Sequence, residues 1–159
     1  KEKQPDNLGE FTVPVGKVEI TKEGSDVTLI TYGSTWRIVT EAAEELEKLG
    51  ISAEVIDVQS LIPFDIEHDI LESIKKTNRI VAIDEDVEGG ATAYMLQQVL
   101  EKQGGFKYLD SAPLSISAKN HRPAYASDGD YFSKPSVDDV VEKVYLLFHE
   151  VNPNKFPKF

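Results

Sequence analysis

The sequence of 159 residues contains no cysteine, which excludes disulfide bonds and thiolate metal ligands within it. No apolar run is long enough to span a bilayer and no charged-then-apolar leader opens the chain, so we expect no membrane contact and a cytoplasmic location. Basic residues are also scarce, since 17 Lys and Arg face 28 Asp and Glu for a net charge of -11. Phosphate backbones are bound by clustered Lys and Arg, so this balance argues against a nucleic-acid partner.

Motifs of common catalytic sites are missing as well. The chain has no Gly-x-Gly-x-x-Gly or Gly-Lys-Ser/Thr phosphate loop, no Gly-x-Ser-x-Gly nucleophile elbow and no His-Glu-x-x-His metal motif. Asp128-Gly129-Asp130, with Asn152 and Asn154 downstream, superficially resembles a Gly-Asp-Gly…Asn motif for magnesium and thiamine diphosphate. Tyr131 stands where that motif needs its last Gly, so we interpret the match as coincidental and expect no complete active site.

The chain does contain a regular alternation of β-rich and helical segments. Residues 27–32 are apolar and β-branched without alternation, which is typical of a strand covered on both faces. Gly33 permits a turn, Ser34 or Thr35 is placed to cap the following helix, and Gly50 is placed to end it. We expect strands over residues 18–21, 27–32, 51–58, 79–84 and 114–117, and helices that follow Thr35, Asp65, Gly90 and Ser136.

This alternation predicts an α/β protein, a three-layer αβα sandwich around a mixed, mostly parallel sheet of about five strands. Residues 22–25 offer a hairpin turn, which would make the first strand antiparallel and place it at or near an edge. Asp65 is expected to cap a helix whose apolar face begins at Ile66, and Ser136 with Asp139 forms an acidic capping box. We divide the chain into a linker (1–12), one domain (13–150) and a tail (151–159).

Ligands of open α/β sheets bind outside the carboxyl ends of the strands, so polar groups at these ends are the candidates for ligand contact. The helix-start amides of two turns could contact an anion, although turn and cap roles are the simpler interpretation; the residues are Gly33, Ser34, Thr35, Gly89 and Gly90. The acidic run Asp84, Glu85, Asp86 and Glu88 is rich in oxygen ligands but lacks the spacing of a calcium loop. A solvated acidic turn is the favoured interpretation, and we predict no metal site.

The histidines differ in their surroundings. His68 and His149 lie on predicted helices among charged neighbours and are expected at the surface. His121 and Arg122 lie in the long irregular loop 119–135, where together they could receive a carboxylate or phosphate or move a proton. The alternative is that their side chains only hold the loop in place. They are the weak catalytic candidates of this chain.

Several stretches, taken in order, resemble the transketolase C-terminal domain family in the form found in beta subunits of 2-oxo acid dehydrogenases. These stretches are residues 13–20, 23–34, 54–65, 76–81, 88–90 and 134–140. The resemblance spans residues 13 to 150, but the loop 119–131 departs from the family pattern, and His121 matches no family motif.

The resemblance implies an accessory domain that follows a pyrimidine-binding domain in the decarboxylating component of a pyruvate, branched-chain or related dehydrogenase complex. The parent reaction would be oxidative decarboxylation of a 2-oxo acid with acyl transfer to lipoamide. Thiamine diphosphate and magnesium would be held elsewhere in the parent, so this chain would bind neither and would be inactive alone. Its partners would be the other domains and subunits of a homodimer or heterotetramer, and the lipoyl acyltransferase core.

Two alternatives remain open. The parent could be a transketolase or a deoxyxylulose phosphate synthase, for which Arg122 is the only obvious cation near a strand end to receive a sugar phosphate. The chain could also be a non-catalytic interaction module that binds its partner through its negative surface.

Overall fold

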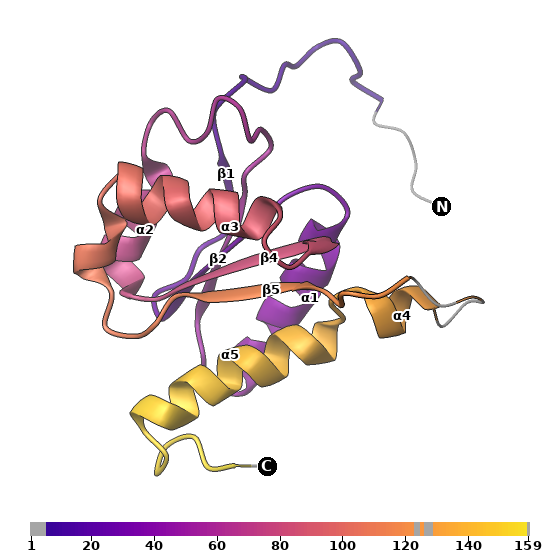
Figure 1. Cartoon of the computed structure of the whole chain (residues 1–159). Helices are drawn as coiled ribbons and strands as arrows, with labels where there is room; N and C mark the ends of the chain where they lie inside the picture. Colours follow the sequence, from indigo (N-terminus) through magenta and orange to yellow (C-terminus); the bar gives the residue numbers. More distant parts are fainter. Residues whose placement is uncertain (1–5, 123–124, 126–128, 159) are drawn as a thin grey trace.

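The computed structural model describes residues 6–122, 125 and 129–158, and its centre is a five-stranded sheet of order β1-β3-β2-β4-β5. The strands are β1 (Glu19–Lys22), β2 (Val27–Thr31), β3 (Ala53–Asp57), β4 (Ile80–Val87) and β5 (Leu114–Ala118). β1 pairs with β3 antiparallel at one edge, and all other pairs are parallel (Figure 1). The mixed sheet with an antiparallel first strand is therefore confirmed.

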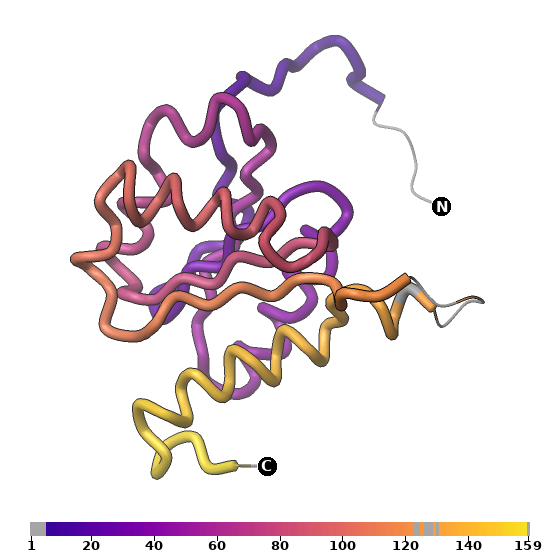
Figure 2. Tube along the Cα trace, in the orientation of Figure 1, coloured from indigo at the N-terminus to yellow at the C-terminus, as the bar shows by residue number. Residues whose placement is uncertain are grey.

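Helices cover both faces of this sheet. They are α1 (Thr35–Lys48), α2 (Asp69–Thr77), α3 (Ala91–Leu96), the π-helix η1 (Gln97–Lys102), the 3-10 helix η2 (Gly105–Tyr108), α4 (Gly129–Ser133) and α5 (Val137–Val151). One core cluster joins α1 and α5 to the sheet, and a second joins α2, α3 and η1 to the opposite face. The path of the chain in Figure 2 shows the same three layers, which confirms the αβα sandwich.

The central strand β2 shows why the pattern predicts this arrangement. Every residue of β2 is buried, with Leu29 in one core cluster and Ile30 in the other. A strand between two helical layers needs apolar side chains on both faces, and the β-branched run supplies them. Gly50, at φ 79°, ends α1 as predicted: its amide and that of Ile51 donate to the carbonyls of Glu47 and Leu46.

The predicted hairpin between β1 and β2 is wrong. β1 pairs with β3 instead, so the intervening residues cross the start of β3. Gly24 makes this crossing possible, since a Cβ there would lie 2.2 Å from the Ala53 carbonyl carbon. The amides of Ser25 and Asp26 then both donate to the Ser52 carbonyl, at 3.1 and 2.8 Å. The turn residues were recognised correctly, but their strand partner is not the next one in sequence.

The predicted start of the second helix was too early. Asp65 does cap α2, but from four residues away: its carboxylate accepts from the amides of Asp69 at 2.9 Å and Ile70 at 3.1 Å. His68, with φ 62°, is the residue before the helix, and Ile66 is 54% exposed rather than part of the apolar face. The intervening turn therefore takes these residues out of the helix.

The carboxyl-terminal third also differs in detail from the prediction. β4 runs three residues further than expected, with Val87 opposite Ala118, and the loop 119–135 contains the short helix α4. The capping box of Ser136 and Asp139 is confirmed. Within the tail, Phe156 is buried against Phe148, with ring centroids 5.4 Å apart, and its carbonyl bonds the half-buried His149.

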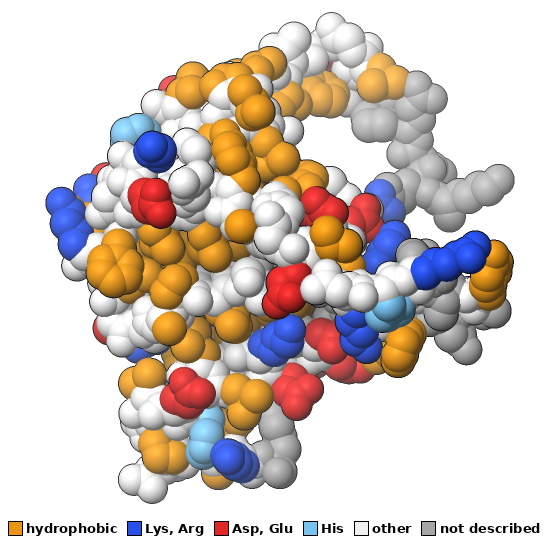
Figure 3. Space-filling model, viewed as in Figure 1, with side chains coloured by type: hydrophobic (Ala, Val, Ile, Leu, Met, Phe, Trp, Pro, Cys, Tyr) orange, Lys and Arg blue, Asp and Glu red, His pale blue; other side chains and the backbone are white. Residues whose placement is uncertain are grey.

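Exposed apolar side chains gather where the N-terminal segment meets the loop between β3 and α2, at the top of the view in Figure 3. We call Val13, Val15, Ile62 and Ile66 the N-terminal apolar patch; their exposed fractions range from 53% to 82%. The two segments are joined by the Gly16 amide, which donates to Ser60 Oγ at 2.6 Å. Among the described residues, no helix is both long enough and apolar enough to cross a membrane.

Candidate functional site

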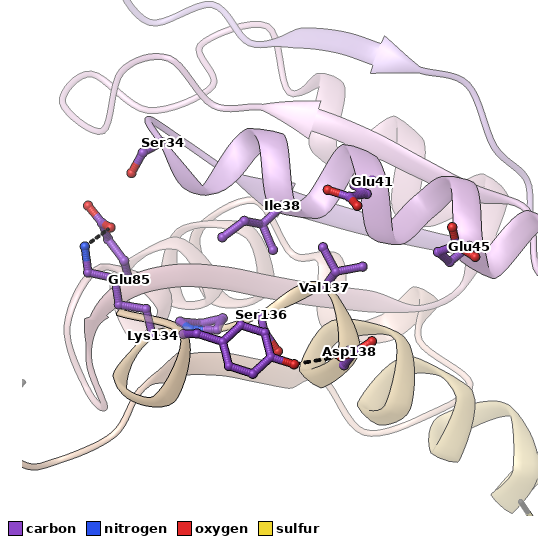
Figure 4. A pocket seen from close by; sticks show the side chains of 11 residues that line it. Ser34, Ile38, Glu41, Glu45, Glu85, Lys134, Ser136, Val137 and Asp138 are labelled. Atoms are coloured by element: carbon purple, nitrogen blue, oxygen red, sulfur yellow. Dashed lines mark hydrogen bonds and ion pairs between the residues drawn. The ribbon is translucent and has the colours of Figure 1, made fainter. Parts of the chain in front are cut away.

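Two adjoining hollows lie at the carboxyl ends of β2 and β4. The smaller, which we call the strand-end cavity, has a volume of about 360 Å³ and is lined by Tyr32, Gly33, Ser34, Asp84, Glu85, Asp86 and Lys134. The larger, the α1–α5 groove, has a volume of about 660 Å³ and runs between α1 and the start of α5 (Figure 4). Ser34, Glu85 and Lys134 line both, so the hollows form one continuous concave surface.

A tyrosine–carboxylate pair lies inside the strand-end cavity. Tyr32, just after β2, donates from its hydroxyl to Asp84 Oδ2 on β4 at 3.0 Å, and Asp84 is only 1% exposed. Burial, the hydrogen bond to Asp84 and the negative charge of that carboxylate raise the pKa of Tyr32 to about 12. Tyr32 therefore holds its proton throughout the physiological range and acts as a hydrogen-bond donor.

The remainder of the strand-end cavity is dominated by carboxylates. Lys134 pairs with Glu85 at 3.0 Å. Asp86 accepts from the Val87 amide at 2.8 Å and lies so close to Gly90 that a Cβ there would be 2.2 Å from Asp86 Oδ2. Gly90 thus leaves room for the Asp86 carboxylate, while Gly89, at φ 85°, forms the turn. Neither glycine is among the residues that line the cavity.

The prediction that Ser34 or Thr35 caps α1 is wrong. Ser34 occupies the N-cap position with helical dihedral angles, φ −65° and ψ −28°, and its side chain makes no capping hydrogen bond. Thr35 is 2% exposed inside the first turn and does not line the cavity. Gly33 and Ser34 do face the cavity, so anion contact at this helix start stays a prediction. The carboxylates next to it disfavour an anion.

Residues 16–139 match the sequence model of the family described as transketolase, C-terminal domain. This chain belongs to that family. Within the family's fold, the chain is similar to a split-gene transketolase solved as an inactive beta4 tetramer, with a TM-score of 0.71 and 26% identity over 90% of this chain and 46% of that one.

Two curated relatives are more similar in sequence. The pyruvate dehydrogenase E1 component subunit beta of Rhizobium meliloti (strain 1021) is 34% identical over 143 residues, which is 90% of this chain and 31% of that protein. Subunit beta-2, mitochondrial, of the same component from Oryza sativa subsp. japonica is 38% identical over 132 residues, which is 82% of this chain and 34% of that protein. The chain thus spans about a third of the length of these relatives.

The transketolase C-terminal domain described here places His121 and Arg122 outside both hollows. Both are exposed, and His121 Nδ1 lies 2.7 Å from the Arg122 carbonyl oxygen, while the centroid of its ring lies 5.5 Å from that of Phe132. Arg122 donates to the Tyr125 hydroxyl at 2.8 Å. Among the described residues, these contacts lie within the loop and α4, as the loop-holding interpretation expects, and a catalytic role for the two residues stays a prediction. In the rejected Asp-Gly-Asp motif, Asp128 lies outside the described residues and Gly129 begins α4.

The residues of the strand-end cavity do not fit thiamine diphosphate and magnesium. A diphosphate requires cationic or amide donors, whereas Asp84, Glu85 and Asp86 surround the cavity and Lys134 is already paired with Glu85. In the described part of the chain, no three His, Asp or Glu side chains are grouped to hold a metal ion.

Sequence reasoning missed the Tyr32–Asp84 pair. Tyr32 and Asp84 end two separate runs predicted as strands, and the order β3-β2-β4 brings those runs side by side. Only strand order, which local pattern does not reveal, makes this tyrosine and carboxylate neighbours. The acidic run itself was recognised, and the structure divides it into a buried residue, Asp84, and the more exposed Glu85, Asp86 and Glu88.

Proposed function

We propose that this chain is the C-terminal accessory and assembly domain of the beta region of a 2-oxo acid dehydrogenase complex. The observation that carries this proposal is the similarity, at 34% and 38% identity, to two pyruvate dehydrogenase E1 beta subunits. The parent reaction is then oxidative decarboxylation of a 2-oxo acid, with transfer of the acyl group to lipoamide. The chain alone is inactive, and thiamine diphosphate with magnesium is held by other parts of the parent enzyme.

The described surface supports an assembly role. The N-terminal apolar patch exposes four aliphatic side chains from two neighbouring segments, and contiguous apolar surface of this kind marks contact with another protein or domain. The partners we propose are the other domains and subunits of a homodimer or heterotetramer, and the lipoyl acyltransferase core. We also propose a cytoplasmic location; the name of the rice relative includes the word mitochondrial.

The test is a calorimetric titration of the chain with thiamine diphosphate and magnesium, repeated on a longer protein that includes the preceding domains. We expect no heat of binding with the 159-residue chain and saturable binding with the longer protein. Tight binding by the chain alone would contradict the proposal and would make the loop around Gly129 the candidate cofactor site.

A transketolase-type parent is the second candidate, and the fold similarity to a split-gene transketolase favours it. A sugar phosphate needs a cation, and Arg122 is exposed on the loop that follows β5. Under this alternative, Arg122→Ala in the full-length enzyme lowers sugar-phosphate turnover at least about tenfold, the loss of one charge-assisted contact. This role would be excluded if the variant turned over such substrates as fast as the natural enzyme. It would also be excluded if neither the natural enzyme nor the variant turned them over.

A further inference from the structure

The α1–α5 groove has a floor and walls of opposite character. Figure 4 shows Ile38 from α1 and Val137 from α5 pointing toward each other across the groove, which forms an apolar floor. Glu85 lies at one end of this floor, and Glu41 and Glu45 follow one another along α1 toward the other end. The groove therefore alternates acidic, apolar and acidic surface along its length.

The charge of the groove is strongly one-sided. Four carboxylates, those of Glu41, Glu45, Glu85 and Asp138, face one ammonium group, Lys134. Lys134 pairs with Glu85, and Lys48 on the outer side of α1 pairs with Glu45 at 2.6 Å. Asp138 accepts from the Tyr131 hydroxyl at 2.7 Å, and within the described part of the chain no salt bridge reaches Glu41 or Asp138. Glu41 and Glu45 are also one helical turn apart, a spacing at which like charges repel.

A ligand that suits this surface must supply cations at both ends and an apolar group between them. The carboxylates disfavour anions, and a polyamine would leave the apolar floor of Ile38 and Val137 without an apolar partner. A volume of about 660 Å³ is ample for a few side chains of an extended segment. Cationic side chains would also relieve the repulsion between Glu41 and Glu45.

We propose that the α1–α5 groove docks a basic segment of another protein, with Arg or Lys residues on both sides of one apolar side chain. The apolar side chain rests on Ile38 and Val137, and the cations face Glu85 at one end and Glu41 with Glu45 at the other. This inference rests on the groove and does not depend on which enzyme the parent is. It also places the contact on the opposite side of the domain from α2 and η1.

The test measures binding of a fluorescently labelled peptide of sequence Gly-Arg-Lys-Leu-Arg-Lys-Gly by anisotropy at low ionic strength. The double variant Glu41→Gln/Glu45→Gln removes two groove charges, and Glu44→Gln/Glu47→Gln removes two charges from α1 residues that do not line the groove. We expect binding about tenfold weaker for the first variant and changed less than about twofold for the second, which has the same net charge. Equal weakening by both variants would overturn the proposal.

Two further measurements separate specific docking from attraction of a polycation to an acidic protein. A peptide with Ser in place of Leu should bind the natural chain about fivefold more weakly, because it loses the contact with the apolar floor. Amide chemical shifts of the natural chain, followed during the titration, should change most at Ile38 and Val137. Equal binding of the two peptides, shifts spread over the acidic surface, or no binding at millimolar peptide would each overturn the proposal.

Discussion

The buried carboxylate of Glu54 shows how strongly one side chain can depend on one partner. Glu54 lies on β3 with 0% exposure, and its Oε2 accepts from Lys76 Nζ and, at 3.2 Å, from the Gly24 amide. Burial alone would raise the pKa of Glu54, but the hydrogen bonds, above all that from Lys76, outweigh it and the pKa is lowered. The neighbouring Lys75 instead pairs with the exposed Glu72.

Lys76→Met should therefore destabilise the protein far more than Lys75→Met. We expect the free energy of unfolding to fall by about 2–4 kcal/mol for the first variant, because it leaves a buried carboxylate without its counter-ion. The second should cost less than about 1 kcal/mol, since it breaks only an exposed pair. Urea unfolding of the two variants at neutral pH measures the difference, and equal losses would contradict the role given to Glu54.

The same pair predicts a pH dependence. Because the folded-state pKa of Glu54 lies below its ordinary value of 4.5, the stabilisation is present above that value and is lost as the pH falls through the folded-state pKa. The stability difference between the natural chain and Lys76→Met should therefore shrink on acidification below about pH 4. Urea unfolding at a series of pH values measures it, and a difference that stays constant or grows would show that Glu54 is not the titrating partner.

Tyr32 carries a second residue-scale prediction, at alkaline pH. With a folded-state pKa of about 12 against an ordinary value of 10.0, Tyr32 stays protonated in the fold where the unfolded chain would ionise. Its contribution to stability is therefore present below pH 10 and is lost as the pH rises toward about 12. In a tyrosinate absorbance titration, Tyr32→Phe should remove a high-pH step, and Asp84→Asn should move that step to lower pH. A profile unaltered by both changes would refute the pairing.

Two serines at helix starts allow a matched test at the scale of the element. Ser136 accepts from the Asp139 amide at 3.2 Å and donates to the Asp139 carboxylate, whereas Ser34 at the start of α1 makes no side-chain cap. Ser136→Ala should thus lower the free energy of unfolding by about 1 kcal/mol, and Ser34→Ala should leave it within about 0.5 kcal/mol. Thermal and urea unfolding of both variants measure this, and a costly Ser34→Ala would show an N-cap that the structure lacks.

Some features of the helices and strands depend on residues close together in the sequence, and others depend on residues far apart. The run that became β2, the Gly50 stop and the box at Ser136 are encoded by residues within one or two turns of one another, and all three were predicted. The choice of β3 rather than β2 as the partner of β1 depends on contacts between residues 33 to 38 positions apart, such as Glu19 with Asp57, and it was predicted wrongly. The same holds for the strand-end cavity. The sequence shows the acidic run, but it does not show that Tyr32 pairs with Asp84.

At the scale of the whole molecule, the apolar residues that stabilise the fold are separate from the exposed patch that we propose for assembly. The two core clusters bury the apolar faces of the helices against the sheet, while the N-terminal apolar patch remains exposed. The chain as a whole has a net charge of -11. A net negative charge opposes the association of copies, so we expect contact at an apolar patch. Val15 and Ile62 are its most exposed members, at 69% and 82%.

Val15→Ser with Ile62→Ser should therefore weaken assembly without weakening the fold. We expect the free energy of unfolding to stay within about 0.5 kcal/mol of the natural value, because neither side chain contributes to a core cluster. In the protein that includes the preceding domains, sedimentation velocity should show the assembled form of the variant dissociating at a concentration at least about tenfold higher. Phe106→Ser is the control, since Phe106 is equally exposed, at 69%, but belongs to η2 and not to the patch. If the control dissociates like the double variant, or if the double variant assembles as the natural protein does, the patch is not the assembly surface and the proposed role needs another interface.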